Sequence, residues 1–418
     1  MKILFLSTSE QNGGAAIAAS RLMQALNKSG HDAKMLVRDK QTNNPNVISI
    51  DTSWLKTKIN LLRFAWERGV IFVNNRFSKK NLFAISIANT GTDISRHSLV
   101  KWADIIHLHW INQGFLSLKN IEKLIQTGKP IVWTMHDMWA CTGICHHAYE
   151  CEHFKKNCGI CPFLHTPKAN DLSHKIFQKK AFVKKSDIRF VAVSNWLKRM
   201  AESSGITKNS VIQVVPNVID TDIFKPENKI ATRASLAWEA DKKIILMGAA
   251  ALNNSIKGFG YLCKALSILT KKSNANDYLL VLFGSIKNNP DFLANLPVPH
   301  CHVGSISDPR QLAKLYQAAD VTVVSSLYET FGQTISEAMA CACPAVSFNN
   351  SGQTDIIDHK QNGYLATYKS ADDLAKGIEF CLENMERLSR AAREKVLGQY
   401  SEKVVAKRYL ELYSQLIK

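Results

Sequence analysis

The sequence lacks a run of about 18 apolar residues, the length that a helix needs to cross a lipid bilayer. The apolar stretch at residues 1–6 turns polar at Ser7. It is too short for the apolar core of a secretory signal peptide, and no small-residue cleavage site follows it. We therefore interpret this stretch as a buried first β-strand. The expected location is the cytoplasm, with peripheral attachment to the inner face of the plasma membrane as a further option.

Low-complexity segments and internal repeats of solenoid length are also missing, which argues against a disordered chain and against a repeat architecture. Hydrophobic residues make up 46% of the 418 residues and charged residues 21%, which is typical of globular proteins. A chain of this length exceeds what one hydrophobic core usually supports. Two domains are therefore expected.

Positive charge is concentrated in the first half of the chain. Residues 1–200 hold 29 Lys and Arg against 13 Asp and Glu, whereas the remaining 218 residues hold 24 against 22. A basic surface on one half indicates an anionic partner, such as phosphate groups, nucleic acid or an acidic membrane leaflet, or else only a soluble basic surface. No recognised nucleic-acid-binding motif accompanies the charge, so nucleic acid is not expected as a partner.

Short apolar runs alternate with helical patterns along the chain, which favours an α/β fold with parallel sheets covered by helices. The strands expected in the first half lie at residues 2–7, 33–38, 105–108, 131–135 and 189–194. The strands expected in the second half lie at residues 243–248, 278–284, 321–325 and 344–348. Each set indicates one doubly wound domain, and ligands should bind where the strands end. The apolar spacing of residues 401–418 predicts a final amphipathic helix.

The segment at residues 328–340 follows an expected strand and opens a helix. Gly332 allows the backbone to approach a ligand closely, and the free N–H groups of the first helical turn can bind an anion such as a diphosphate. Glu329 precedes the helix and Glu337 lies inside it, so the two carboxylates could bind hydroxyl groups on different parts of one elongated ligand. The alternative is a helix with acidic residues near its positive end, stabilised by its dipole.

This segment closely resembles the donor-binding motif of family 4 glycosyltransferases, retaining enzymes of the GT-B fold, with two facing Rossmann-like domains and a cleft between them. The resemblance covers nearly the whole chain. The members of the family that the chain resembles are those of bacterial surface-polysaccharide biosynthesis. It implies that Glu329 contacts the donor sugar and that Glu337 binds the ribose hydroxyls. The backbone at Phe331 and Gly332 is implied to hold sugar and phosphate, and Gln333 is implied to join these donor contacts.

The resemblance also implies a role for each domain. Residues 1–217 are expected to form an N-terminal, acceptor-side domain with a cysteine-rich insertion at about residues 141–161. Residues 218–400 are expected to form the domain that binds the nucleotide sugar. The helix expected at residues 401–418 should pack back on the N-terminal domain.

Two further features of the first half fit this family. Gly13 and Gly14 form a glycine turn between the first strand and a helix, which suits a phosphate or a polar sugar and also suits a plain turn. His136 ends an expected strand, and an isolated histidine is more often a core residue. The resemblance implies that His136 contacts the donor sugar near the reacting carbon. His107 and His109 end the preceding strand, and one of them could face the acceptor.

The phosphate-binding cations depart from the family pattern. Within residues 247–258 Lys257 is present, but the usual arginine is replaced by alanine. A lysine places one charge on the phosphates without the bidentate geometry of arginine. Asp220 and Asp222 have the spacing of a metal-binding pair found in another glycosyltransferase fold. We reject that interpretation because the GT-B fold uses amides and Lys257, so no cofactor is expected for catalysis.

Five of the ten cysteines cluster in the insertion. In a cytosolic chain they are expected to be thiols or metal ligands rather than disulfides. Cys158 and Cys161 have the spacing of half a zinc knuckle, and Cys145 and Cys151 could supply the other two ligands of a structural zinc ion. Unligated thiols are the alternative.

Residues 54–83 interleave apolar and aromatic side chains with lysines and arginines. A helix of this kind can lie in an anionic membrane interface, although ordinary core helices look similar. With the basic first half, the pattern fits an acceptor presented on a lipid carrier.

The sequence thus predicts a retaining glycosyltransferase that moves a hexose-type sugar from a nucleotide-diphosphate sugar to a hydroxyl of a glycan acceptor, expected to be lipid-linked, in cell-surface polysaccharide synthesis. No covalent nucleophile is evident, so the family analogy favours a same-face mechanism in which the leaving phosphate assists deprotonation. A nucleotide-sugar epimerase of the same fold and a non-catalytic sugar- or nucleotide-binding subunit stay open as alternatives.

Overall fold

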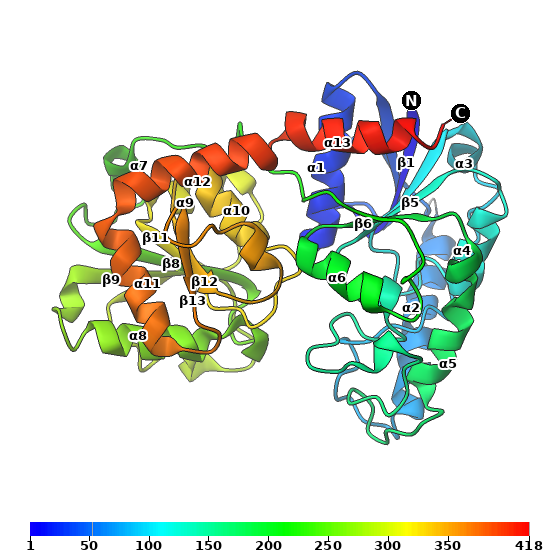
Figure 1. Cartoon of the computed structure of the whole chain (residues 1–418), viewed down its shortest axis with the longest axis horizontal. Helices are drawn as coiled ribbons and strands as arrows, with labels where there is room; N and C mark the ends of the chain where they lie inside the picture. The colour runs from blue at the N-terminus through cyan, green and yellow to red at the C-terminus, as the bar shows by residue number, and fades with distance from the viewer. Residues whose placement is uncertain (52, 418) are drawn as a thin grey trace. The chain divides into compact units, whose positions relative to one another are not determined.

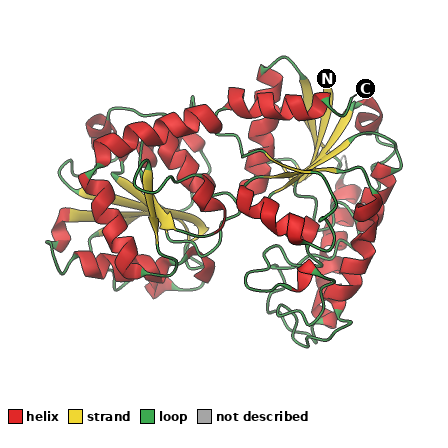
Figure 2. Cartoon of the chain, viewed as in Figure 1, coloured by secondary structure: helices red, strands yellow, loops and turns green. Residues whose placement is uncertain are grey.

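The computed structural model describes residues 1–51 and 53–417. The chain divides into two compact units, Met1–Pro216 with Ala406–Lys418 and Asn217–Val405. Each unit is built on one parallel β-sheet flanked by helices (Figures 1 and 2). In the described part of the chain, no helix has both the length and the apolar character that a membrane span requires.

The sheet of the first unit has the strand order β3-β2-β1-β4-β5-β6-β7, with all neighbours parallel. Its strands are β1 (Lys2–Ser9), β2 (Asp32–Asp39), β3 (Val47–Ser49), β4 (Ile105–Leu108), β5 (Ile131–Met135), β6 (Arg189–Ala192) and β7 (Ile212–Val214). Its helices are α1 (Gly14–Lys28), α2 (Trp54–Asn74), α3 (Ser98–Trp102), α4 (Leu118–Ile125), α5 (Leu172–Lys179) and α6 (Asn195–Ser203), with the short 3₁₀ helices η1 (Trp139–Cys141), η2 (His153–Lys155) and η3 (Lys180–Lys185).

The sheet of the second unit has the order β10-β9-β8-β11-β12-β13, again fully parallel. Its strands are β8 (Lys243–Ala251), β9 (Tyr278–Ser285), β10 (His300–His302), β11 (Val321–Val324), β12 (Ala345–Phe348) and β13 (Gly363–Ala366). Its helices are α7 (Lys229–Ser235), α8 (Phe259–Leu269), α9 (Pro309–Ala318), α10 (Gln333–Ala340), α11 (Ala371–Glu383) and α12 (Met385–Gln399), with the 3₁₀ helices η4 (Ser255–Lys257), η5 (Ala275–Asp277), η6 (Pro290–Leu293) and η7 (Ser351–Asp355).

In both sheets the strand order reverses next to the strand that comes first in sequence. The reversal lies between β1 and β4 in the first sheet and between β8 and β11 in the second. In doubly wound sheets ligands bind outside the carboxyl ends of the strands at this reversal. The central strands are buried on both faces, which is why β1, β4, β5, β11 and β12 read as continuous apolar runs.

The nine strands expected from the sequence are all present, with ends shifted by one to three residues or unchanged. Four strands had no counterpart in that expectation, namely β3, β7, β10 and β13, and all four are sheet edges. An edge strand has a neighbouring strand on one side only, and these four strands are short. Long apolar runs, by which the other strands were recognised in the sequence, are therefore not needed there. The strand β10, for example, reads His-Cys-His.

The helix expected across residues 54–83 is shorter than the pattern suggested. α2 ends at Asn74, and Arg76 and Phe77 adopt left-handed backbone angles with φ of 50° and 59°, which a continuing helix does not allow. At the other end of the chain, α13 (Glu402–Ser414) replaces the helix expected at residues 401–418, whose last residue, Lys418, lies outside the described residues.

The final part of α13 contributes to the first unit through two tyrosines. The hydroxyl of Tyr409 lies 2.9 Å from the hydroxyl of Thr134 in β5, and the hydroxyl of Tyr413 lies 2.7 Å from Nδ1 of His107 in β4. All four side chains are buried. The end of the chain therefore completes the polar core beneath the carboxyl ends of β4 and β5.

A buried ion pair joins α7 to the start of β11 in the second unit. The guanidinium of Arg233 donates to a carboxylate oxygen of Asp320 over 2.6 Å, and its other nitrogens donate to the backbone carbonyls of Ala318, Ala240 and Lys242. The same carboxylate accepts the N–H of Ile244 in β8. Asp320 thus orients both the helix and the strand that precede the reversal point.

Replacing Asp320 should destabilise the protein strongly, because Arg233 would keep a buried charge without its counter-ion. We expect Asp320→Ala to lower the free energy of unfolding by about 3–5 kcal/mol. Glu379, whose ion pair with Lys272 is solvent-exposed, provides the control: Glu379→Ala should cost less than about 1 kcal/mol. Urea denaturation and calorimetry of both variants test this, and equal losses would contradict it.

Candidate functional site

Two of the predicted donor residues meet at the reversal point of the second sheet. Lys257 ends η4, which follows β8, and Glu329 lies in the loop between β11 and α10. The Nζ atom of Lys257 lies 2.7 Å from a carboxylate oxygen of Glu329. The side chains are 27% and 20% exposed, so the pair is accessible to a ligand from solvent.

The loop that carries Glu329 is held on both sides. The hydroxyl of Ser325 donates to the carbonyl of Lys257 over 3.0 Å, which ties the end of β11 to η4. The N–H of Glu329 donates to the hydroxyl of Ser351, and the N–H of Gly352 donates to the carbonyl of Glu329. The sequence analysis did not identify Ser351 and Gly352, because they follow the next strand, β12, and carry no charged group.

Two glycines allow this close packing of turns. Gly258 has φ of 65°, and a Cβ atom there would lie 1.9 Å from the carbonyl oxygen of Ser325. Gly332 has φ of 109° and is the N-cap of α10. The helix that starts at Gln333 therefore presents its first N–H groups, which have no acceptor within the helix, next to the loop that carries Glu329. Such a helix start favours the binding of an anion.

Glu337 lies on the second turn of α10 and is only 5% exposed. One carboxylate oxygen accepts from the hydroxyl of Tyr316 and the other from the side-chain amide of Gln333, both over 3.3 Å. The side chain of Phe331 is buried and packs edge-to-face on Tyr400, with ring centroids 5.6 Å apart. Phe331 can therefore offer a ligand its backbone rather than its ring.

In the first unit, two histidines meet where β4 and β5 end. Nδ1 of His109 lies 2.9 Å from Nε2 of His136, and the two rings stack with centroids 5.2 Å apart. The ring of His109 also stacks on Phe5 of β1, with centroids 5.1 Å apart. Burial lowers the pKa of His136 to about 4 and holds the pKa of His109 well below its usual range, so both rings are neutral at neutral pH.

The hydrogen-bond pattern assigns the protons of this pair. Nε2 of His109 is buried and has no hydrogen-bond partner in the described part of the chain. A buried N–H without an acceptor is costly, whereas a bare ring nitrogen is less so. We infer that His109 carries its proton on Nδ1 and donates it to Nε2 of His136. His136 then carries its own proton on Nδ1.

Of the two histidines named as candidates to face the acceptor, His107 is excluded by its burial. Its ring is fully buried, and its two nitrogens are bonded to the hydroxyls of Thr134 and Tyr413. His107 is therefore part of the core and does not face an acceptor. Sequence alone could not show this, because Tyr413 lies some 300 positions away along the chain.

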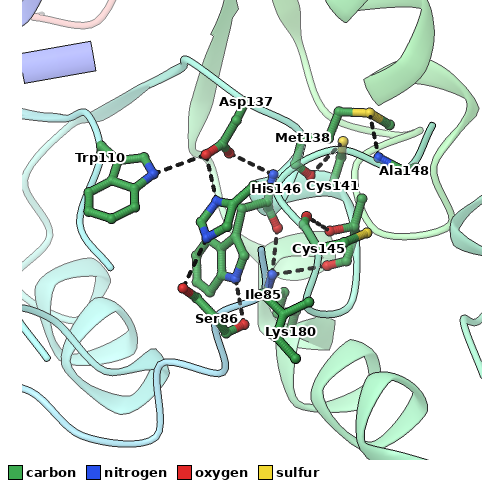
Figure 3. Close-up of polar contacts among 12 residues, drawn as sticks. Ile85, Ser86, Trp110, Asp137, Met138, Cys141, Cys145, His146, Ala148 and Lys180 are labelled. Atoms are coloured by element: carbon green, nitrogen blue, oxygen red, sulfur yellow. Dashed lines mark hydrogen bonds and ion pairs between the residues drawn. The ribbon is translucent and has the colours of Figure 1, made fainter. Parts of the chain in front are cut away.

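A small pocket beside His136 includes residues that the sequence analysis missed. Asn112 lines it, and its buried side-chain nitrogen has no partner among the described residues. Asp137 lines it as well and accepts from the indole of Trp110 over 3.0 Å and from His146 over 2.6 Å (Figure 3). The signal for Asp137 was its position directly after His136, where a strand ends.

The remaining predicted residues lie elsewhere. Gly13 has φ of 90° and is the N-cap of α1, and Gly14 is the first residue of that helix; both are exposed beyond the end of β1. Asp220, Asp222 and Glu402 have oxygens within 4.8 Å of one another. A carboxylate oxygen of Asp220 accepts the N–H groups of Asp222 and Ile223 over 3.1 and 3.0 Å, as a local cap. Four cysteines of the insertion, Cys145, Cys151, Cys158 and Cys161, line a separate pocket.

Solved structures share this architecture over the whole chain. Sucrose-phosphate synthase from Thermosynechococcus elongatus superposes with a TM-score of 0.68 at 19% identity, over 100% of this chain and 99% of that chain. HepE from Anabaena, solved with UDP and glucose, superposes with a TM-score of 0.66 at 15% identity, over 100% of both chains. The fold is the α/β GT-B fold of glycosyltransferases, as predicted.

Sequence comparison gives the family. Residues 12–223 match the family described as Glycosyltransferase Family 4, and residues 228–395 match Glycosyl transferases group 1. The chain belongs to glycosyltransferase family 4, which confirms the predicted resemblance.

Two relatives illustrate the range of similarity. An uncharacterized glycosyltransferase of Methanocaldococcus jannaschii is 26% identical over 80% of this chain and 90% of that relative. The N,N'-diacetylbacillosaminyl-diphospho-undecaprenol alpha-1,3-N-acetylgalactosaminyltransferase of Campylobacter jejuni is 30% identical over 59% of this chain and 63% of its own length.

The low pKa of His136 predicts that the folded state becomes less stable as the pH falls. The unfolded chain binds a proton at this residue below pH 6.5, whereas the folded chain does so only near pH 4. Stability from this group is therefore complete above pH 6.5 and is lost as the pH falls toward 4. We expect urea denaturation to show about 2–3 kcal/mol of this loss between pH 7 and pH 4.5, with a shallower decline in His136→Gln. His165→Gln, at an exposed position, should keep the wild-type profile; an unchanged profile in His136→Gln would contradict the assignment.

Proposed function

We propose that this glycosyltransferase moves a hexose-type sugar from a nucleotide-diphosphate sugar to a hydroxyl of a lipid-linked glycan, with retention of the anomeric configuration. The observation that carries the donor assignment is the Lys257–Glu329 ion pair beside the first turn of α10, at the reversal point of the second sheet. This position combines a cation, a carboxylate and free backbone N–H groups within one unit.

Each group suits one part of the donor. The ammonium of Lys257 and the N–H groups at the start of α10 offer positive potential for the diphosphate. The carboxylate of Glu329 can accept hydroxyl groups of the sugar, and that of Glu337 can accept hydroxyl groups of the ribose. Lys257 exchanges part of its contact with Glu329 for the phosphate when the donor binds. A UDP complex is known for HepE, a structure of the same fold.

In the proposed reaction the bond between the anomeric carbon and the diphosphate oxygen breaks. A bond forms between that carbon and the acceptor oxygen on the same face, and the acceptor proton passes to the departing phosphate. Negative charge develops on the diphosphate, where Lys257 and the start of α10 stabilise it by fixed dipoles and charge. His136, neutral at neutral pH, offers its Nδ1–H as a hydrogen-bond donor to the sugar.

A membrane-bound acceptor is supported by the unusual polarity of α2. Its inward face buries polar side chains: Glu67 is fully enclosed and accepts the N–H groups of Ile87 and Ala88. Its outward face is apolar, with Trp54 74%, Leu62 67% and Trp66 64% exposed.

Basic residues accompany these apolar side chains. Lys56 and Lys58 lie on α2, and Lys79 and Lys80 follow it. The ammonium of Lys58 lies 5.6 Å from the ring of Trp54. Exposed indoles beside lysines suit the interface of an anionic bilayer. The Campylobacter relative, which carries a diphospho-undecaprenol acceptor in its name, agrees with such a location.

Substitutions of the acidic pair test the donor assignment. We expect Glu329→Gln and Glu337→Ala each to lower kcat/KM by about 100-fold or more, because each removes a carboxylate that aligns the donor. Glu379→Gln, at a partly exposed site on α11, should leave kcat/KM unchanged. A panel of UDP-, GDP-, ADP- and TDP-sugars is assayed with extracted lipid-linked glycans. Release of an altered free sugar without acceptor would indicate an epimerase, and full activity in both variants would refute the assignment.

Vesicle binding tests the membrane assignment. The triple variant Trp54→Ser, Leu62→Ser and Trp66→Ser should weaken binding to vesicles of phosphatidylglycerol and phosphatidylcholine by about tenfold or more, because it removes the exposed apolar side chains that would enter the bilayer interface. Ile230→Ser, an equally exposed apolar residue in the second unit, serves as the control. Wild-type binding should also weaken as salt is added. Equal sedimentation of the triple variant and the wild type would contradict the proposal.

A further inference from the structure

The cysteine-rich insertion forms a compact site that the proposed reaction does not use. Four of its cysteines come from separate points along residues 145–161 and face one small apolar pocket, and none is in a disulfide. The pocket is lined by Ile144, Cys145, Ala148, Cys151, His153, Phe154, Cys158, Gly159, Cys161, Phe163 and Ser173. Four soft sulfur ligands around one space are the donor set that zinc prefers in structural sites.

The turn between Cys158 and Cys161 is rigid. Cys158, Gly159 and Ile160 all have left-handed φ angles, of 50°, 112° and 47°. A Cβ atom on Gly159 would lie 2.3 Å from the carbonyl oxygen of Ala169, so only glycine fits there. Such a turn keeps both sulfurs of the Cys-x-x-Cys pair on the same side, toward the pocket.

A buried lysine supplies an independent observation. The ammonium of Lys180 is almost completely enclosed, donates to the carbonyls of Trp139 and Thr142 over 2.5 and 2.9 Å, and lies 3.4 Å from the ring centroid of Trp139 (Figure 3). No carboxylate forms an ion pair with it among the residues that the structure describes. The ionisable groups that interact with it include the thiols of Cys141, Cys158 and Cys145 and the carboxylate of Asp137.

A buried charge is costly unless an opposite charge accompanies it. Neutral thiols do not provide one. Burial lowers the pKa of Lys180 to about 7. A zinc ion with four thiolates carries a net charge of about −2, and such an anion near Lys180 would favour the charged form of the lysine.

We propose that Cys145, Cys151, Cys158 and Cys161 bind one zinc ion as thiolates, with Lys180 as the nearby compensating cation. Among the described residues, three potential ligand atoms lie within 4.8 Å of one another only at Asp220, Asp222 and Glu402. The sulfurs of the four cysteines are therefore further apart than this. Zinc binding must therefore draw the four sulfurs inward to Zn–S distances of about 2.3 Å. The role is structural, because the pocket is apolar and all four ligand positions are filled by protein.

The site connects to the histidine pocket through His146, directly after Cys145. Nδ1 of His146 bonds to Asp137 over 2.6 Å, and its Nε2 bonds to the hydroxyl of Ser86 over 3.0 Å (Figure 3). Cys145 itself pairs with Ile85 in an isolated antiparallel bridge. A zinc-bound insertion would therefore hold His146 against Asp137, the neighbour of His136.

Metal analysis of the purified full chain tests the proposal without any measurement of sugar transfer. We expect about one zinc per chain by mass spectrometry, and a cobalt-substituted sample should show the strong sulfur-to-cobalt absorption of a tetrahedral thiolate site. Metal-free protein with four titratable thiols in this segment, or pairs of disulfides in peptide mapping, would overturn it. These measurements on the wild type do not depend on whether a variant folds.

Variants then identify the ligands. Cys158→Ser and Cys161→Ser should lose the zinc, whereas Cys301→Ser, in β10 of the second unit, should keep it. His153→Ala should also keep it, and loss there would overturn the four-cysteine ligand set. Lys180→Met should weaken zinc affinity by about 10-fold or more, as substitutions next to metal ligands commonly do; unchanged affinity would refute its role as the compensating cation.

Discussion

The ion pair between Lys257 and Glu329 exists because β8 and β11 are neighbours in the second sheet although some 70 residues separate them in sequence. The strand order reverses between them, so the loops that follow the two strands start side by side at their carboxyl ends and lead away in opposite directions. Two glycine turns and the start of a helix, rather than packed side chains, lie beyond these strand ends. A cation, a carboxylate and backbone N–H groups can therefore stay accessible together.

The carboxyl ends of the strands in the first sheet carry different groups. Histidines follow β4 and β5 there, and they are buried against Phe5 and against each other. Burial removes charge from these rings, so these strand ends supply neutral hydrogen-bonding groups instead of ions. The tyrosines of α13 close the polar core below, which explains why the end of the chain belongs to the same unit as its beginning.

Two parts of the first unit lie outside the common α/β plan. α2 presents apolar side chains to solvent and polar ones to the interior, the reverse of an ordinary surface helix. The cysteine-rich insertion packs around sulfurs and a buried ammonium instead of a large apolar core. We propose that a component outside the chain completes each of them, a lipid surface in one case and a metal ion in the other.

The sequence by itself determined the α/β class, the nine inner strands, the family and the acidic motif. These depend on local patterns: apolar runs that must be buried on both faces, and glycines that turns require. Tertiary structure decided the rest. The edge strands, the pairing of His109 with His136, the burial of His107 by Tyr413 and the position of Lys180 beside the thiols all arise from residues far apart in the chain. No local pattern encodes such contacts, because they depend on which strands become neighbours and which side chains the packing encloses.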